Sequence, residues 1–136
     1  MKKRIKEKIK EIEIFIQEIE EILPSSLEEY LRNFIVRGSC ERYFEKIIEA
    51  VIDVSFMIIR DKKLELPNTE EHAFNILMNN KIIGENLCKK LKDAKGMRNF
   101  IVHQYGRIDD ELVFHTVAWE LIPDVREFIN KVKSIK

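Results

Sequence analysis

Isoleucine and leucine recur at alternating spacings of four and three residues near the start of the chain. This spacing matches the period of an α-helix and gathers the apolar side chains into one stripe. Only four glycines and three prolines occur among 136 residues, and no alternating run typical of a strand stands out. We therefore predict an all-α fold, an antiparallel up-and-down bundle of four main helices plus a short helix, in a single domain at residues 1–136. The first stripe contains Ile5, Ile9, Ile12, Ile16, Ile19 and Leu23.

The composition excludes several classes of protein. Apolar residues make up 45% of the chain and charged residues 35%, a balance typical of globular rather than disordered proteins. The longest apolar run, at residues 47–59, contains Glu49 and Asp53 and is unsuited to a membrane. Because the first residues lack the apolar segment of a secretory signal, we expect a cytoplasmic protein in which Cys40 and Cys88 are free, buried thiols.

The net charge constrains any interaction with nucleic acid. Lysine plus arginine and aspartate plus glutamate each number 24, so the formal net charge is zero. A simple polycationic binder obtains its affinity from many phosphate contacts and needs an excess of positive charge. Any RNA site must therefore be local, or be built by several subunits.

Capping residues predict the boundaries of the first helices. Residues 24–25 end the first helix, and residues 26–29 form a capping box that opens a second. The Gly-Ser pair at residues 38–39 predicts a break or kink. The helix at residues 43–59 is apolar around most of its circumference, so we expect it to be the central one.

The second half of the chain contains similar signals for the boundaries of helices. A threonine N-cap precedes a short helix at residues 70–79, and a longer helix runs from about Glu85 to a stop at Gly106. A last helix starts at residues 109–111, and Pro123 inside it should produce a kink. Its predicted apolar stripe contains Leu112, Thr116, Trp119, Ile122, Val125, Ile129 and Val132.

Four kinds of polar group interrupt the penultimate helix at residues 98–105, which read Arg98-Asn99-Phe100-Ile101-Val102-His103-Gln104-Tyr105. Within about two helical turns they include a permanent cation, an amide, a phenol and an imidazole, the side chain that changes charge near neutral pH. An apolar core needs none of these groups. Cleavage of RNA without a metal ion can use all four.

Helical geometry separates two of these groups. On an ideal helix Arg98 continues the stripe of residues 87–94 and lies in line with Tyr105, facing the core or an interface. An unpaired cation there is costly, so we expect Arg98 to have a partner or to line a polar cleft. Asn99 and His103 share a different face. Either the helix ends or distorts near His103, or a second subunit supplies the other half of the site.

The pattern Arg-x-x-x-x-His-x-Tyr, with a polar residue directly after the arginine, resembles the HEPN superfamily, in particular the HepT-like toxins found beside minimal nucleotidyltransferase antitoxins. The similarity includes the long amphipathic first helix, the segment Glu41–Ala50 that opens the central helix, and Gly96-Met97 leading into the motif. The acidic turn and closing helix after Tyr105 also fit. The resemblance covers essentially the whole chain.

This resemblance implies a metal-independent endoribonuclease toxin that acts as a homodimer without a cofactor, with motif residues of both chains at a shared cleft. His103 would act as general base on the ribose 2′-hydroxyl, or as general acid on the leaving 5′-oxygen. Arg98 would hold the phosphate and stabilise the transition state, and Asn99 would orient the imidazole or the phosphate. The products would be a 2′,3′-cyclic phosphate and a 5′-hydroxyl end.

The resemblance also implies a regulatory role for Tyr105. It matches the tyrosine that the partner nucleotidyltransferase of this family adenylylates, which neutralises the toxin. A bulky, anionic AMP beside Arg98 and His103 would occupy the phosphate site.

Each motif residue also has a structural interpretation. Arg98 can cap a helix end or bridge an acidic side chain, His103 can be an interface histidine, and Tyr105 can be a core aromatic residue. For the whole protein, the alternative is a non-catalytic HEPN module that partners a minimal nucleotidyltransferase. The presence of Arg98, Asn99 and His103 together argues against that alternative.

Other candidate residues have weaker signals. His72 and His115 have no cysteine, aspartate or second histidine at metal-ligand spacing, so we expect no metal site. The lysines at residues 89–95 are either a solvated face or a patch that guides RNA toward the motif. We expect Trp119 in the core or in a dimer interface rather than as a platform for base stacking.

Overall fold

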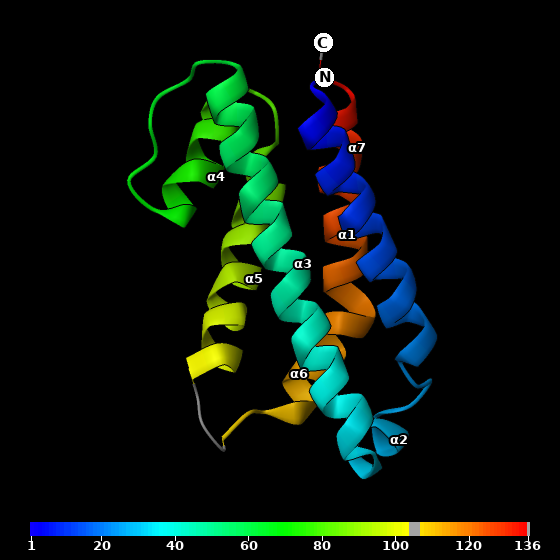
Figure 1. Ribbon diagram of the computed structural model, residues 1–136. Coiled ribbons are helices and arrows are strands. Elements are labelled where there is room, and N and C mark those ends of the chain that lie inside the picture. The colour runs from blue at the N-terminus through cyan, green and yellow to red at the C-terminus, as the bar shows by residue number, and fades with distance from the viewer. Residues whose placement is uncertain (104–106, 136) are drawn as a thin grey trace.

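The computed structural model describes residues 1–103 and 107–135. Within these residues, four long helical segments run up and down the bundle and two short helices accompany them (Figure 1). In this part of the chain, no helix combines the length and the apolar character needed to cross a membrane. The predicted all-α up-and-down bundle is confirmed. The long segments are α1 (Lys3–Ile22), α3 (Phe34–Asp61), α5 (Glu85–His103) and the run of α6 (Asp110–Thr116), η1 (Val117–Leu121) and α7 (Ile122–Lys133), and the short helices are α2 (Leu27–Arg32) and α4 (Glu70–Asn79).

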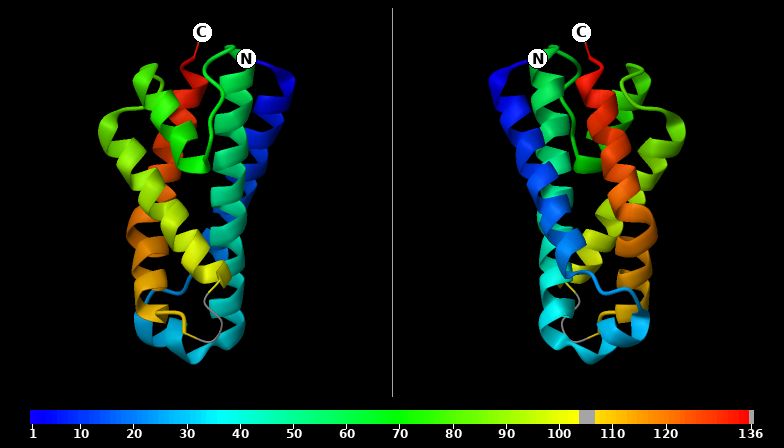
Figure 2. Two further views of the ribbon diagram at one scale, coloured as in Figure 1. Left: turned by 90° about the vertical axis from the view of Figure 1, so that its left-hand side faces the viewer. Right: turned by 90° about the vertical axis from the view of Figure 1, so that its right-hand side faces the viewer.

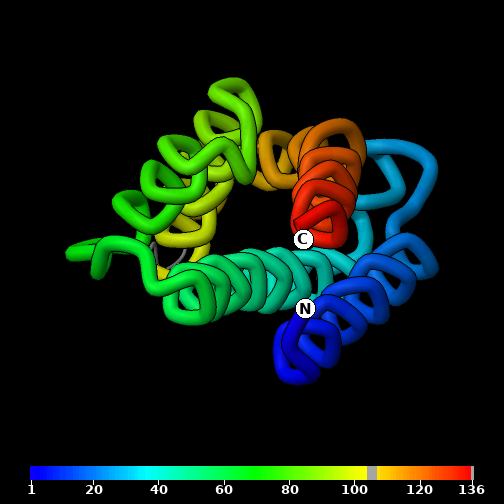
Figure 3. The backbone as a smooth tube through the Cα atoms, turned by 90° about the horizontal axis from the view of Figure 1, so that it is seen from above, coloured from blue at the N-terminus to red at the C-terminus, as the bar shows by residue number. Residues whose placement is uncertain are grey.

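Helix α3 is the central element, as its all-round apolar sequence predicts. It packs against α1, α4 and α5, and it extends along most of the length of the bundle (Figure 2). Seen from above, α1 lies on one side of α3, while α4 and α5 lie on the other (Figure 3). The predicted stripe of α1 is buried in this contact at Ile5, Ile9, Ile12, Ile16 and Ile19.

The boundary between α2 and α3 falls at Asn33, and the predicted break at Gly38 is wrong. The side-chain oxygen of Asn33 accepts hydrogen bonds from the backbone N–H groups of Ile35 and Val36, both at 3.1 Å. Helix α3 then runs unbroken through Gly38. A strong N-cap fixes the start of the helix, whereas a glycine inside a helix costs only about 1 kcal/mol relative to alanine.

The predicted caps at Ser26 and Thr69 and the predicted helix start at Asp109 are confirmed. Each of these residues precedes a helix, and its side-chain oxygen accepts a hydrogen bond from the backbone N–H three residues later, at 3.2, 3.0 and 3.0 Å. These bonds satisfy donors that have no partner inside the helix. The predicted stop at Gly106 lies outside the described residues.

The closing helical segment is irregular close to Pro123, where the sequence predicts a kink. Residues 117–121 form the π-helical segment η1, directly before the proline that cannot donate a backbone hydrogen bond. Such a turn holds an extra residue, which disturbs the regular helical spacing within it. The predicted stripe is wrong at Trp119, which lies in this turn and is 73% exposed, and at Leu112 in the first turn of α6, which is 50% exposed. It is confirmed at Thr116, Ile122, Val125, Ile129 and Val132, which are buried.

Both cysteines are free, buried thiols, as predicted. Burial raises the pKa of Cys40 to about 11, and burial also raises the pKa of Cys88 above its usual value. The thiolate is the reactive form of cysteine. Both side chains are therefore protonated core residues at neutral pH.

Two substitutions test the position of the α2–α3 boundary. Asn33→Ala removes the acceptor for two N–H groups and should lower the free energy of unfolding by about 1–2 kcal/mol. Gly38→Ala should raise it by up to about 1 kcal/mol, because an added Cβ meets no atom within 4 Å. Chemical denaturation measures the free energy of unfolding of both variants. A destabilised Gly38→Ala variant would contradict a continuous helix at this point.

Candidate active site

Helix α5 carries the polar motif on its last two turns. It packs against α3, α4 and α7 and buries Leu87, Cys88 and Leu91 in the core. Its C-terminal end lies away from the end of the bundle where both termini are found (Figure 1). The helix is regular through His103, the last residue described before the turn to α6. The backbone of Arg98, Asn99 and His103 is thus held by one rigid element.

Arg98 is buried, with 9% of its surface exposed, and its guanidinium is surrounded by acceptors. Its Nη2 donates to Oε1 of Glu70 at 2.6 Å, and its Nε donates to Oδ1 of Asn99 at 2.9 Å. Its Nη1 lies 3.9 Å from Oε1 of Glu49. The expectation that a cation on this stripe needs a partner is confirmed.

These contacts bring residues of three helices together at one positive charge. Glu70 is the first residue of α4 and Glu49 lies in α3, so Arg98 of α5 connects all three. The Glu70 and Glu49 side chains remain 38% and 47% exposed. Water therefore screens the outer part of the cluster, and the guanidinium lies just beneath an accessible, polar surface.

Asn99 is a neighbour of Arg98 both in sequence and in space. It is partly buried, and its side-chain oxygen is engaged by Nε of Arg98. In this chain the amide therefore orients the guanidinium, a contact that the sequence pattern did not assign to it. The amide nitrogen of Asn99 retains two donors that a phosphate oxygen can accept.

His103 is exposed on the last turn of α5. Five residues separate it from Arg98 on a regular helix, which places the two side chains about 140° apart around the helix axis. The helix is not distorted between them. One chain thus presents the guanidinium and the imidazole in different directions, as the sequence geometry predicts. Tyr105 lies outside the described residues.

The lysines before the motif are partly neutralised by their neighbours. Nζ of Lys90 lies 3.7 Å from Oδ1 of Asp124, and Nζ of Lys95 lies 3.9 Å from Oε1 of Glu71. Lys89 is exposed. Two of the four lysines are therefore used in tying α5 to α7 and α4, which favours the interpretation as a solvated face over the RNA-guiding patch.

The contacts of the remaining histidines indicate structural roles. Nδ1 of His72 accepts a hydrogen bond from the backbone N–H of Asn68 at 2.9 Å, and Nε2 of His115 lies 3.8 Å from Oε1 of Glu111. Among the residues that the structure describes, no three histidine, cysteine or acidic side chains gather in a way that could hold a metal ion. Trp119 is exposed and so is not a core residue; its predicted place in a dimer interface stays a prediction.

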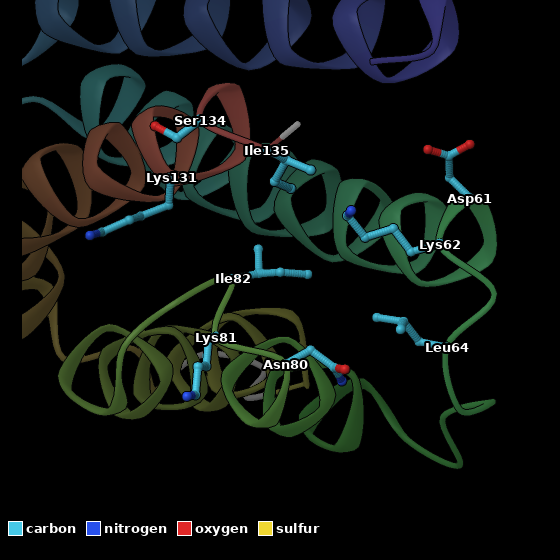
Figure 4. Close-up of a pocket in the computed structure, with 9 residues that line it drawn as sticks. All are labelled: Asp61, Lys62, Leu64, Asn80, Lys81, Ile82, Lys131, Ser134 and Ile135. Atoms are coloured by element: carbon cyan, nitrogen blue, oxygen red, sulfur yellow. The ribbon is translucent and has the colours of Figure 1, made fainter.

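A pocket of about 880 Å³ lies far from the motif, where α3, α4 and α7 end. Lys62, Lys81 and Lys131 are among its lining residues, and their ammonium groups are spread apart rather than aimed at one point (Figure 4). Lysines at helix C-termini offset the partial negative charge of the last carbonyl groups. The three lysines that line this pocket therefore have a structural explanation.

Sequence reasoning missed Glu49 and Glu70 as members of the site. In the sequence, Glu49 stands out only as a charge that interrupts an apolar run, and Glu70 only as the first residue of the short helix at residues 70–79. A carboxylate inside the most apolar helix was the available signal, because such a group needs a cationic partner. The pairing of Glu70 with a residue 28 positions later gave no local signal.

Comparison with known proteins identifies relatives of this chain. The family profile described as "Ribonuclease HepT-like" matches residues 7–132. The chain is 29% identical over 106 residues to the mRNA nuclease HepT of Shewanella oneidensis, covering 78% of this chain and 79% of that one. It is 32% identical over 96 residues to the tRNA nuclease HepT of Aphanizomenon flos-aquae, covering 71% and 65% of the two chains.

Solved structures show the same relationship. The tri-AMPylated Shewanella oneidensis HEPN toxin, in complex with its MNT antitoxin, superposes with a TM-score of 0.91 at 27% sequence identity. The superposition covers 99% of this chain and 100% of that toxin. The whole bundle, including the position of the motif helix within it, is therefore shared.

Arg98 and His103 should differ in their effect on stability. Arg98→Ala should lower the free energy of unfolding by about 1–3 kcal/mol, because hydrogen bonds to charged groups are lost at the junction of three helices. His103→Ala should change it by no more than about 0.5 kcal/mol, because an exposed side chain is removed. Thermal and chemical unfolding of both variants measure this. An equally destabilised His103→Ala variant would contradict the exposed position of the imidazole.

Proposed function

The chain belongs to the HepT-like ribonuclease family, and we propose on this premise that it is an endoribonuclease toxin of a toxin–antitoxin pair. The observation that carries the proposal is Arg98, a guanidinium oriented by Glu70 and Asn99 just below the surface, five residues before an exposed His103. The nuclease names of two relatives support the reaction class. The structure of the Shewanella oneidensis HEPN toxin in complex with its MNT antitoxin supports the biological setting.

The residues present fit transesterification of RNA. A base removes the proton of the ribose 2′-hydroxyl, the 2′-oxygen attacks phosphorus, and the bond to the 5′-oxygen breaks as an acid protonates that oxygen. Imidazole performs either proton transfer at neutral pH. Arg98 stabilises the negative charge on the phosphoryl oxygens of the pentavalent transition state. The reaction requires a 2′-hydroxyl, so we propose RNA as the substrate and a mechanism that needs no metal ion.

We place the site between two copies of the chain. Arg98 and His103 diverge on a regular helix, so a cleft that uses both side chains is completed by a second subunit. Two-fold symmetry is the commonest arrangement of such pairs, and it brings Arg98 of each chain toward His103 of the other. The divergence of the two side chains supports this arrangement.

We further propose that a minimal nucleotidyltransferase is the antitoxin and that it transfers AMP to Tyr105. The tri-AMPylated toxin seen with its MNT antitoxin supports both points. Tyr105 follows His103 by two residues. AMP groups attached there add negative charge and bulk next to the residues that bind the scissile phosphate, so RNA is excluded by charge and by steric overlap.

One observation favours the alternative of a non-catalytic module that partners the nucleotidyltransferase. Arg98 is paired with Glu70 in its own chain, and a bridging arginine can be purely structural. Growth arrest on expression without the partner distinguishes the two functions. Arrest that depends on His103 supports the toxin, and normal growth supports the module.

The first test is cleavage of RNA by the purified protein in excess EDTA. We expect cleavage that leaves 2′,3′-cyclic phosphate ends, and we expect Arg98→Ala and His103→Ala each to reduce it by at least about 100-fold. Gel and mass analysis of a defined RNA measure both. Activity retained in both variants would exclude this site.

Mixing the two inactive variants tests the composite site. In a mixed dimer one cleft lacks both groups and the other retains both, so a composite site should regain about a quarter of wild-type activity at equal mixing. A site formed within each chain would regain none. A monomeric mass at micromolar concentration would also contradict the proposal.

The regulatory proposal is tested with Tyr105→Phe. This variant should remain toxic and cleave RNA, because the phenol oxygen takes no part in the transfer, but co-expression of the nucleotidyltransferase should no longer protect the cell. In the wild-type toxin, mass spectrometry should find AMP on the peptide containing Tyr105. Full protection of cells carrying Tyr105→Phe would contradict this mode of neutralisation.

A further inference from the structure

Glu70 is the best-placed carboxylate around Arg98. Its Oε1 accepts from Nη2 at 2.6 Å, the length of a strong charge-assisted hydrogen bond. Glu49 lies 3.9 Å from Nη1, which is too far for a hydrogen bond. Glu70 therefore fixes the direction of the guanidinium plane, whereas Glu49 contributes only a more distant charge.

The backbone beneath Glu70 is rigid. Thr69 caps α4 by accepting a hydrogen bond from the N–H of His72 at 3.0 Å. The helix is anchored in the core by Ala73, Phe74, Ile76 and Leu77, which are buried. A carboxylate on the first residue is also stabilised by the helix dipole. The acceptor that meets Arg98 is thus held in place before any substrate arrives.

Two contacts orient the guanidinium and leave part of it free. Glu70 engages Nη2 and Asn99 engages Nε, whereas a guanidinium has five N–H donors in one plane. Two hydrogen bonds from different nitrogens fix both the rotation of the side chain and the tilt of that plane. The remaining donors can meet the oxygens of a phosphate without breaking either contact.

We propose that Glu70 is a positioning residue for RNA cleavage, acting through Arg98. This inference rests on the proposed function, because the benefit of a fixed guanidinium is realised at the scissile phosphate. A displacement of about 1 Å at a catalytic group can cost about 100-fold in rate. Loss of Glu70 removes one of the two contacts that prevent such a displacement.

The chain offers a matched control in the next residue. Glu71 lies 3.9 Å from Lys95, so it also joins α4 to α5 through a carboxylate and a cation. Among the described residues, Arg98 forms its ion pairs with Glu49 and Glu70, and Glu71 is not one of its partners. Glu71→Ala therefore removes a similar bridge between the same two helices while leaving the guanidinium held.

The experiment compares Glu70→Ala, Glu70→Gln and Glu71→Ala in the full-length protein. We expect kcat/KM for RNA cleavage to fall about 10- to 100-fold in Glu70→Ala. In Glu70→Gln it should fall less than about tenfold, because the amide oxygen still accepts the bond from Nη2. In Glu71→Ala it should stay within about twofold of wild type. Glu70→Gln keeps the test informative if the alanine variant is poorly folded.

A second measurement monitors the guanidinium of Arg98 in the absence of RNA. The Nε–H signal of Arg98 in nitrogen-15 NMR spectra is assigned by its loss in Arg98→Lys. Glu70→Ala removes the contact at Nη2, so the guanidinium can rotate and weaken the bond from Nε to Asn99. Exchange of the Nε–H with water should therefore accelerate about tenfold or more in Glu70→Ala and stay unchanged in Glu71→Ala. A general loosening of the α4–α5 contact would alter both variants alike.

Three results would overturn the inference. They are wild-type or higher cleavage by Glu70→Ala, an equal loss in Glu71→Ala, and unchanged Nε–H exchange in Glu70→Ala. Failure of the proposed function looks different, because the wild-type protein would then not cleave RNA, or would cleave it as well as Arg98→Ala does. In that case the NMR readout still shows whether Glu70 holds the guanidinium.

Discussion

The ion pair between Arg98 and Glu70 is the interaction on which the site depends. An arginine with only 9% of its surface exposed is stable in the core only with acceptors around its guanidinium. The bundle supplies them from α3, α4 and the motif helix itself. The short helix α4 thus has a function in the fold beyond filling a surface. It brings a carboxylate to the one cation that interrupts the apolar stripe of α5.

This arrangement also sets the electrostatics of the site. One guanidinium faces two carboxylates, and the net charge of the chain is zero, so a phosphate meets little attraction from a single subunit. Both carboxylates are partly exposed and screened by water. An RNA backbone therefore gains most when a second source of positive charge is present. The cleft that we propose between two copies would supply one, because each copy would contribute its own Arg98.

The sequence predicts most of the fold because helices are local structures. The spacing of Ile5 to Ile19 and the caps at Ser26, Thr69 and Asp109 act within a few residues, and each is confirmed. The errors arise where local signals compete. The N-cap at Asn33 sets the helix boundary that Gly38 was expected to set. Trp119, which lies in the π-helical segment before Pro123, is exposed although the regular stripe predicts it to be buried.

The candidate site is predictable only in part for the same reason. Arg98 and His103 are separated by a helical rotation that follows from sequence spacing alone, and the structure keeps that separation. The need of Arg98 for a partner also follows from its place on the stripe. The identity of that partner depends on tertiary packing, because Glu70 precedes Arg98 by 28 residues. Helical periodicity carries no information about how the start of α4 meets the end of α5.

The separation of the two groups has a consequence for regulation. In the dimer that we propose, the cation fixed inside one chain and the imidazole exposed on the other chain act on one phosphate where the two surfaces meet. Anything that occupies the space between those surfaces blocks both groups at once, without unfolding either chain. Tyr105 follows His103 by two residues in the sequence. The AMP modification that we propose at Tyr105 would add charge and volume two residues after the imidazole, and it would silence the proposed shared site by both effects.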